Sequence, residues 1–308
     1  MYGARLEKTM ANPWSLNNSD GIVILRLAEN SLLQEDIADF VKAQASPTVT
    51  IAVLPTEHPT YSTRPRGSRR LRRAAAAFMT EEFQAREPVT EDNIFVTPGL
   101  ASAMDANARV IGAPYEGIEG YSNLEDLFHP EVNKMALESL LRKAEDDGIT
   151  VRALLVSKLQ LHFISDEIYA KSVFVNAAIA TPISFLSTLT LDLRDVIDPT
   201  ILHVLYGASK DFCANGLRLG LVSTRNEGII GAVSSISMFS WSPHVLQDVW
   251  AAKLEDKAWM DNFMGRKTSL MVENYRIATS FFREHGIRFC EHLRHLLLGK
   301  PITPQLRL

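Results

Sequence analysis

Residues 203–222 hold the lysine and the arginine with the clearest chemical potential in the chain. An apolar, β-branched run ends in small residues just before Lys210, and Arg218 follows between Gly216 and Gly220. A lysine whose charge is disfavoured by partial burial and a neighbouring cation has a lowered pKa, and its neutral amine can form a Schiff base with an aldehyde. An arginine beside glycines can bind a phosphate through paired hydrogen bonds. The stretch indicates pyridoxal phosphate (PLP), but lysines at strand ends and arginines near glycines are common, so it leaves the question open.

A second stretch, residues 162–173, carries an acidic residue at the end of an apolar segment. This segment runs into Ser165-Asp166-Glu167-Ile168-Tyr169. In PLP enzymes an aspartate at a strand end keeps the pyridine nitrogen protonated, which lets the ring accept electrons. Asp166 and Tyr169 are therefore the expected partners of the cofactor ring.

Together these stretches resemble the class I/II, fold-type I PLP-dependent aminotransferases, in particular the fungal branch similar to 1-aminocyclopropane-1-carboxylate synthase. The resemblance covers most of residues 12–290, and several motifs in the right order are far more specific than any one of them. The matching motifs are Leu27-Ala28-Glu29-Asn30, Tyr61 with Gly67-Ser68-Arg69-Arg70-Leu71-Arg72, Val96-Thr97-Pro98-Gly99, residues 165–170, residues 209–212, residues 216–220 and residues 238–243.

The resemblance implies where the cofactor phosphate would bind. Pro98-Gly99 turns a short strand into a helix, and the free amides at a helix N-terminus favour an anion. Backbone amides near Leu100 and Ala101 are the expected phosphate donors, together with Ser209 and Arg218. A strand, a glycine turn and a helix in succession are by themselves only weak evidence for a phosphate site.

Two more residues are placed near the site by the resemblance alone. Tyr61 lies in a turn-rich loop and would reach the cofactor phosphate in a neighbouring subunit, which implies a homodimer; a structural tyrosine is the alternative. Glu29 would contact an amino-acid-like substrate at the rim of the site, or it is a surface residue before a helix.

Composition excludes several other classes of protein. The chain has 308 residues, is 46% hydrophobic and contains no run of apolar residues long enough to span a membrane. A formal charge of -4 gives no reason to expect nucleic acid, and the basic residues 64–73 are expected to form a solvated helix start. Cys213 and Cys290 support neither a disulfide framework nor a metal site. With no apolar signal segment at the N-terminus, the expected location is cytoplasmic.

The pattern predicts an α/β fold: the three-layer large domain of a fold-type I PLP transferase, with a mainly parallel sheet. Residues 1–59 form an N-terminal segment, 60–255 the PLP-binding large domain, and 256–308 a long helix with the truncated start of a small domain. Helices are expected at 33–45, 68–83, 227–238, 243–254 and 258–285, and strands at 94–97, 151–157 and before residues 165 and 207.

The sequence departs from the family in several places. Blocks are missing near residues 108–109 and 157–161, and the second gap removes an asparagine expected to bind the cofactor and most of a crossover helix. Gly207 replaces a phosphate-binding hydroxyl, and after residue 290 nothing matches the small domain or its carboxylate-binding arginine. Misjoined exons or a pseudoenzyme would produce this pattern, so we expect low stability and weak activity.

Three functions remain open from the sequence. The first is a PLP-dependent aminotransferase, or a C–S or 1-aminocyclopropane-1-carboxylate synthase-like lyase, acting on an amino-acid-like substrate in fungal secondary-metabolite biosynthesis. The second is a catalytically impaired PLP-binding protein, and the third is a remnant that acts only as an interaction partner. Fold and cofactor do not choose among these.

Overall fold

The computed structural model describes residues 12, 17–18, 20–22, 30, 32–44, 65–100, 115, 117–122, 126, 129–149, 153–154, 162–174, 184–193, 196–237, 240–287 and 289. Its sheet has the strand order β1-β5-β4-β3-β2, formed by Ile94–Thr97, Gly220–Thr224, Leu202–Gly207, His162–Asp166 and Ala153–Leu154. β2, β3 and β4 pair in parallel, whereas β5 is antiparallel to both β4 and β1. The four other strands therefore share one direction, which confirms the mainly parallel sheet.

Both faces of the sheet are apolar, and helices cover each of them. On one face, Val204, Tyr206 and Leu221 pack in a large core with α3 (Arg69–Glu82), α7 (His244–Glu255) and the start of α8 (Lys257–Glu284). On the other face, Phe95, Leu205 and Val222 pack against α6 (Glu227–Ser237). Sheet residues alternate between the two faces because successive side chains point in opposite directions. The expected helix–sheet–helix arrangement is confirmed.

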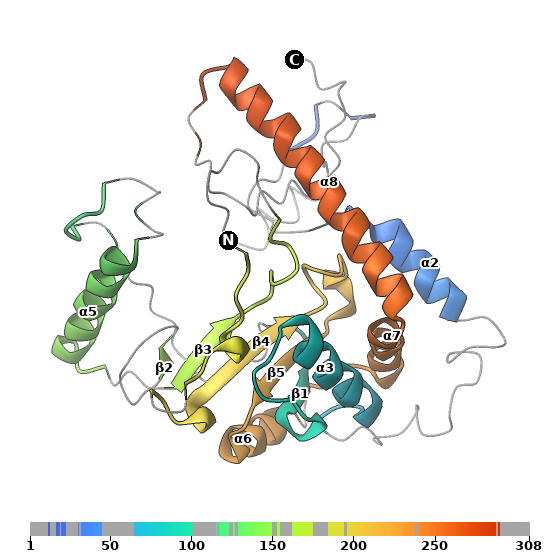
Figure 1. Ribbon diagram of the computed structural model, residues 1–308, viewed down its shortest axis with the longest axis horizontal. Coiled ribbons are helices and arrows are strands. Elements are labelled where there is room, and N and C mark those ends of the chain that lie inside the picture. Colours follow the sequence, from blue (N-terminus) through green and yellow to red (C-terminus); the bar gives the residue numbers. More distant parts are fainter. Residues whose placement is uncertain are drawn as a thin grey trace.

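The remaining helices lie outside these layers. In Figure 1, α2 (Gln34–Gln44) lies beside α8, while α5 (Pro130–Asp146) lies beyond the β2 edge of the sheet. Short 3-10 turns precede β1 (η1, Glu91–Asn93), β4 (η4, Pro199–Ile201) and β5 (η5, Asn215–Leu217), and η3 spans Thr188–Thr190. No helix in these described parts is long and apolar enough to cross a bilayer.

Helix boundaries follow local capping signals in the sequence. The Ser68 side chain accepts a hydrogen bond from the Leu71 amide at the start of α3, and Asn226 Oδ1 accepts one from the Ile229 amide at the start of α6. Gly286 follows α8 with a φ of 65°, a left-handed conformation that glycine adopts without strain. The sequence predicted all three boundaries to within a residue or two.

The pairing of β2 with β3 is unusual for parallel strands. Ala153 is opposite His162 and Leu154 is opposite Phe163, yet only residues 155–161 separate the two strands in sequence. A parallel connection normally needs a dozen or more residues, often a helix. This bears out the expectation that the connection is no ordinary crossover. The connecting residues and the other expected gap, near residues 108–109, lie outside the described residues.

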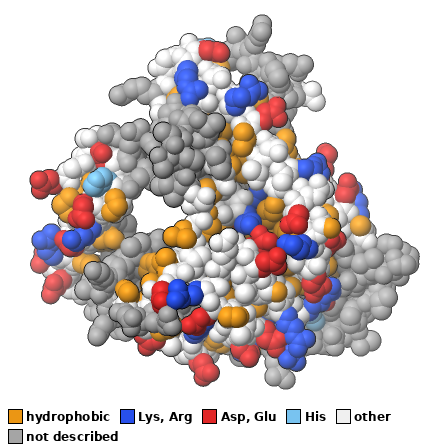
Figure 2. Space-filling view, in the orientation of Figure 1, with side chains coloured by type: hydrophobic (Ala, Val, Ile, Leu, Met, Phe, Trp, Pro, Cys, Tyr) orange, Lys and Arg blue, Asp and Glu red, His pale blue; other side chains and the backbone are white. Residues whose placement is uncertain are grey.

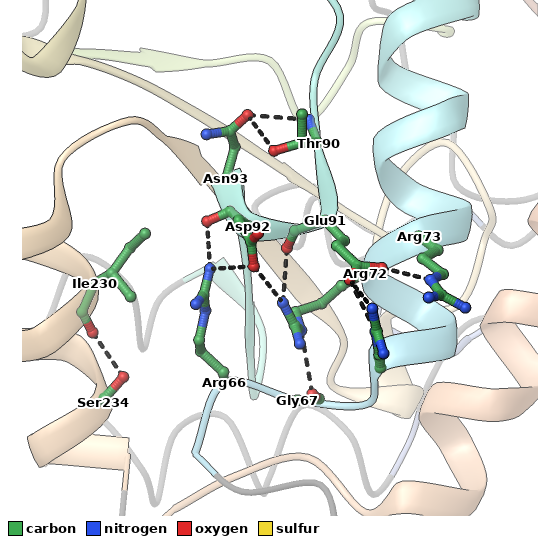
Figure 3. Close-up of polar contacts among 11 residues, drawn as sticks. Arg66, Gly67, Arg72, Arg73, Thr90, Glu91, Asp92, Asn93, Ile230 and Ser234 are labelled. Carbon is green, nitrogen blue, oxygen red and sulfur yellow. Dashed lines mark hydrogen bonds and ion pairs between the residues drawn. The ribbon is translucent and has the colours of Figure 1, made fainter.

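The basic cluster at residues 64–73 differs from the solvated helix start that we expected. Figure 3 shows Arg66 and Arg72 extending to the turn η1. Arg72 donates to the carbonyl oxygen of Glu91 over 2.7 Å, and Arg66 donates to that of Asp92. Burial lowers the pKa of Arg72, with the nearby Arg66 charge acting in the same direction. These two arginines are half-buried braces for the chain that enters β1, so the expectation was wrong for them.

Candidate active site

Strand directions bring the predicted site residues to one edge of the sheet. β1, β3 and β4 end at this edge with Thr97, Asp166 and Gly207, and the antiparallel β5 begins there with Gly220. Gly220 is paired with both Thr97 and Gly207. The segments after β1, β3 and β4 and the segment before β5 therefore meet at the carboxyl ends of the parallel strands, where open α/β sheets bind ligands.

Lys210, Tyr169 and Asp166 lie together at this edge. Lys210 is half-buried, and its Nζ lies 5.9 Å from the centroid of the Tyr169 ring. Desolvation by the surrounding atoms is the main cause that raises the pKa of Asp166, although the side chain keeps some contact with solvent. The hydrogen bond from the Ile168 amide and the charge of Lys210 oppose this shift. Burial likewise raises the pKa of Tyr169, and Asp166 adds to that effect. An acid and a phenol with raised pKa values, beside a lysine, can together bind and release a proton.

Gly99, which follows β1, allows Arg218 to approach the backbone closely. Gly99 has a φ of 88°, and a Cβ on Gly99 would collide with Nη2 of Arg218. Arg218 is exposed and donates from Nη1 to the Asn215 carbonyl oxygen over 2.9 Å. The guanidinium thus lies against Gly99, and the next residue, Leu100, begins a helix and has its amide close to Gly220; we call Gly99, Leu100 and Arg218 the anion cradle. Backbone amides beside a guanidinium suit a phosphate group.

The sheet geometry explains why position 207 carries no hydroxyl. A Cβ on Gly207 would lie 2.9 Å from the Leu219 carbonyl oxygen and 3.2 Å from side-chain carbons of Ile168 and Leu100. Backbone oxygen cannot move away from such a contact without disturbing β5. Ser209, two residues further on, is half-buried and is the hydroxyl that remains near Lys210.

Ser242 holds the two halves of the anion cradle together, and the sequence reasoning assigned it no role. Its buried hydroxyl lies 3.1 Å from the Thr97 carbonyl oxygen and 3.0 Å from the Arg218 carbonyl oxygen, and it can donate to either. Ser242 is part of a family motif that we quoted, yet only the packing of α7 against the sheet indicates this contact.

Three predicted site residues cannot be compared with the structure. Glu29, Tyr61 and Ala101 lie outside the described residues, so their roles stay predictions. A shallow hollow does occur at the other edge of the sheet, lined by residues that include Arg86, Leu202 and Thr224. Leu202 begins β4 and Thr224 ends β5, so this hollow lies at the opposite end of the strands from Lys210.

Comparison with known proteins shows which proteins the chain as a whole is similar to. The sequence model of the family Aminotransferase class I and II matches residues 149–298. The 1-aminocyclopropane-1-carboxylate synthase-like protein 1 of Arabidopsis thaliana is 23% identical and aligns with 95% of this chain. Its namesake from Takifugu rubripes is 28% identical over 79% of the chain, and a probable aminotransferase of Aspergillus oryzae is 26% identical over 91%. The chain spans 70%, 45% and 76% of these three proteins, respectively.

Solved structures share the fold at lower identity. A mutant aspartate aminotransferase of Thermus thermophilus in complex with tryptophan superposes with a TM-score of 0.57 and 17% identity, covering 92% of this chain and 77% of its own. Aspartate aminotransferase from Thermotoga maritima gives a TM-score of 0.55 at 19% identity, covering 94% and 79%. The molecule is thus an α/β protein with the large-domain fold of the aminotransferases.

The sequence match over residues 149–298, just under half of the chain, makes it similar to the class I and II aminotransferases. The resemblance expected from the motifs is confirmed, including the likeness to synthase-like proteins and to a fungal aminotransferase. The incomplete coverage of the relatives agrees with the expectation of missing blocks.

Proposed function

We propose that the chain binds PLP through Lys210 and belongs to an enzyme that transfers the amino group of an amino-acid-like substrate. The observation that carries this proposal is the shared edge of the sheet, where Lys210 and Asp166 lie near the anion cradle. A Cβ on Gly99 would collide with Arg218, so only glycine at this position allows the backbone and the guanidinium to contact the same anion. The residues present therefore fit a phosphorylated aldehyde.

Each of these residues has a defined task in the proposal. The anion cradle binds the phosphate with help from Ser209, and Asp166 keeps a proton on the pyridine nitrogen. The Lys210 amine would hold the aldehyde group of the cofactor, and its Nζ would take the proton from the substrate Cα and return it. PLP, when bound, supplies an electron sink for the bonds at Cα. The Tyr169 side chain lies beside Lys210 and orients it.

A lyase is the second candidate because several relatives carry the name of 1-aminocyclopropane-1-carboxylate synthase. Transamination and C–S or C–N elimination start from the same Cα deprotonation, and fold alone does not separate them. A catalytically impaired PLP-binding remnant is the third. We further propose that residues 1–59, 60–255 and 256–308 are the structural divisions, that the protein is a cytoplasmic homodimer, and that it serves fungal secondary-metabolite biosynthesis. Light scattering of the purified protein tests the dimer.

Absorbance spectroscopy tests the central proposal. Purified chain mixed with PLP should give a visible band that borohydride removes, and mass spectrometry should then find the reduced cofactor on Lys210. The Lys210→Ala variant should lack the band and remain folded, whereas Lys257→Ala, which removes an exposed lysine of α8, should keep it. A cofactor adduct on another lysine would refute the assignment.

Product analysis then separates the candidate reactions. Amino acids offered with a keto-acid acceptor should yield a new amino acid if the enzyme is an aminotransferase. A keto acid formed together with a thiol, or a cyclopropane amino acid, would identify a lyase. A borohydride-sensitive band with no product would identify the impaired remnant.

A further inference from the structure

Asp211, the residue after Lys210, is a fully buried carboxylate with hydrogen bonds on both oxygens. Oδ1 accepts from the Ser172 hydroxyl over 2.5 Å and from Lys267 Nζ over 3.3 Å. Oδ2 accepts from the Lys171 amide over 2.8 Å and from the Tyr206 hydroxyl over 3.0 Å. Four donors on one buried carboxylate hold it in a single position.

These donors link the two turns that carry the proposed site. Lys171 and Ser172 follow directly after the Asp166–Tyr169 turn, and Asp211 belongs to the turn that carries Lys210. Asp211 therefore holds the segment with the proposed ring partner against the segment with the proposed nucleophile. The distance between Lys210 and Asp166 depends on this connection.

Two side chains from distant parts of the sequence hold the carbonyl groups of Lys210 and of the next residue, Asp211. Asn30, which is 1% exposed, donates from Nδ2 to the Lys210 carbonyl oxygen over 3.1 Å. Lys267, fully buried on α8, donates to the Asp211 carbonyl oxygen over 3.1 Å as well as to its carboxylate. Asn30 is itself oriented by the Leu32 amide, which donates to its Oδ1 over 3.2 Å.

We propose that Asn30, Asp211 and Lys267 are positioning residues, which hold the turn that carries Lys210 so that its amine faces Asp166 and the anion cradle. This inference rests on the proposed function and deepens it. Lys210 itself is a long side chain on the turn that follows β4, and an unrestrained lysine side chain has many rotamers to lose when it reacts. Hydrogen bonds to the Lys210 and Asp211 carbonyl groups restrict the backbone of the turn, so fewer orientations of the lysine remain accessible.

The position of Lys267 gives the cluster a second consequence. The long helix α8 follows α7, which packs against the sheet. Figure 1 shows that the C-terminal end of α8 extends away from the sheet. A displacement of α8 near Lys267 would pull on the Asp211 carbonyl oxygen. The reactivity of Lys210 is therefore tied to the packing of α8.

Asn30→Ala is the sharpest test because it removes the side-chain donor to the Lys210 carbonyl oxygen, together with the acceptor of the Leu32 amide, and leaves the hydrogen bonds of Asp211 and Lys267 in place. The Lys210 carbonyl oxygen still accepts from the Cys213 amide over 3.2 Å, so no buried oxygen is left without a donor. Met271→Ala, one turn further along α8 than Lys267, is the matched control. Met271 is 2% exposed and packs with Phe174 and Tyr275, and Leu32 packs against this group. Its loss lowers stability but removes none of the side chains that hydrogen-bond to Lys210 or Asp211.

The first measurement uses the protein without cofactor. Brief labelling with acetic anhydride, followed by mass spectrometry, gives the rate at which Lys210 reacts relative to the exposed Lys257. We expect Asn30→Ala to raise the relative rate at Lys210 several-fold because the loosened turn exposes the amine. Asn30→Gln, which can still donate, should recover part of the wild-type rate, and Met271→Ala should leave the rate within about twofold of wild type.

The second measurement adds PLP and follows the visible band. We expect Asn30→Ala to slow its appearance by about tenfold, the factor that one lost hydrogen bond of about 1.4 kcal/mol gives. Lys267→Met should have a larger effect on the same rate. If Asn30→Ala changes melting temperature as Met271→Ala does but leaves the labelling rate at Lys210 unaltered, the cluster is only structural and the inference is wrong. If wild-type chain forms no borohydride-sensitive band, the proposed function fails, and the labelling rates alone decide the inference.

Discussion

His203 should make the stability of this protein fall steeply in mild acid. Its imidazole is 4% exposed at the start of β4, with Nε2 lying 2.9 Å from His162 Nδ1 and Nδ1 lying 2.6 Å from Thr224 Oγ1. Burial, with a smaller contribution from His162, lowers the pKa of His203 from 6.5 to about 4. The unfolded chain therefore binds a proton between these values while the folded chain does not. Stability is fully present above about pH 6.5 and is lost as the pH falls towards 4.

The expected magnitude follows from the shift. A difference of about 2.5 pKa units at about 1.36 kcal/mol per unit corresponds to about 3 kcal/mol between about pH 7 and about pH 4. Urea unfolding of wild type and His203→Gln over this range measures it, because the difference between the two curves isolates one group. His162→Gln should keep most of the dependence, since burial is the main cause. Equal losses in wild type and His203→Gln would refute the reasoning, as would a histidine titration by NMR that places His203 near 6.5.

Three further predictions concern the site and the core. Asp166→Asn should leave PLP bound but lower turnover by at least about a hundredfold, seen as an intact visible band with little product, and near wild-type turnover would make Asp166 structural. Gly99→Ala should weaken PLP binding about tenfold or more in a fluorescence titration, because its Cβ would displace Arg218, whereas Gly216→Ala, with nothing within 4 Å of its Cβ, should bind normally. Lys253→Met should raise the unfolding free energy by about 2 kcal/mol at neutral pH. Burial lowers the pKa of Lys253 from 10.5 to about 8, and its buried Nζ has no hydrogen-bond partner among the described residues, so the cost of the charge exceeds the contribution of the lost aromatic contacts. That gain should shrink as the pH rises above 8, where the wild-type lysine loses its charge, and a gain that stays constant with pH would contradict the argument.

Local signals were enough to predict most elements of the fold. The apolar spacing of α3, the caps at Ser68 and Asn226, and Gly286 after α8 act over a few residues, so they can be identified one segment at a time. Arg66 and Arg72 show the limit of this approach. Their charges predicted solvation, but their partners are carbonyl oxygens of η1, which the chain brings close only after α3 has folded back onto β1.

The sequence by itself determined the resemblance to the aminotransferases and the residue types at the proposed site, since the motifs around Asp166, Lys210 and Arg218 follow one another in the order that the resemblance requires. Only the tertiary structure decided which of these residues meet. The antiparallel entry of β5 brings Arg218 against Gly99, and the packing of α8 and of the segment at Asn30 fixes the turn around Lys210. These contacts join residues as many as 180 positions apart. The physical reason is that such pairs form only when the sheet and its helices close on a common core, and no local periodicity or cap encodes that closure.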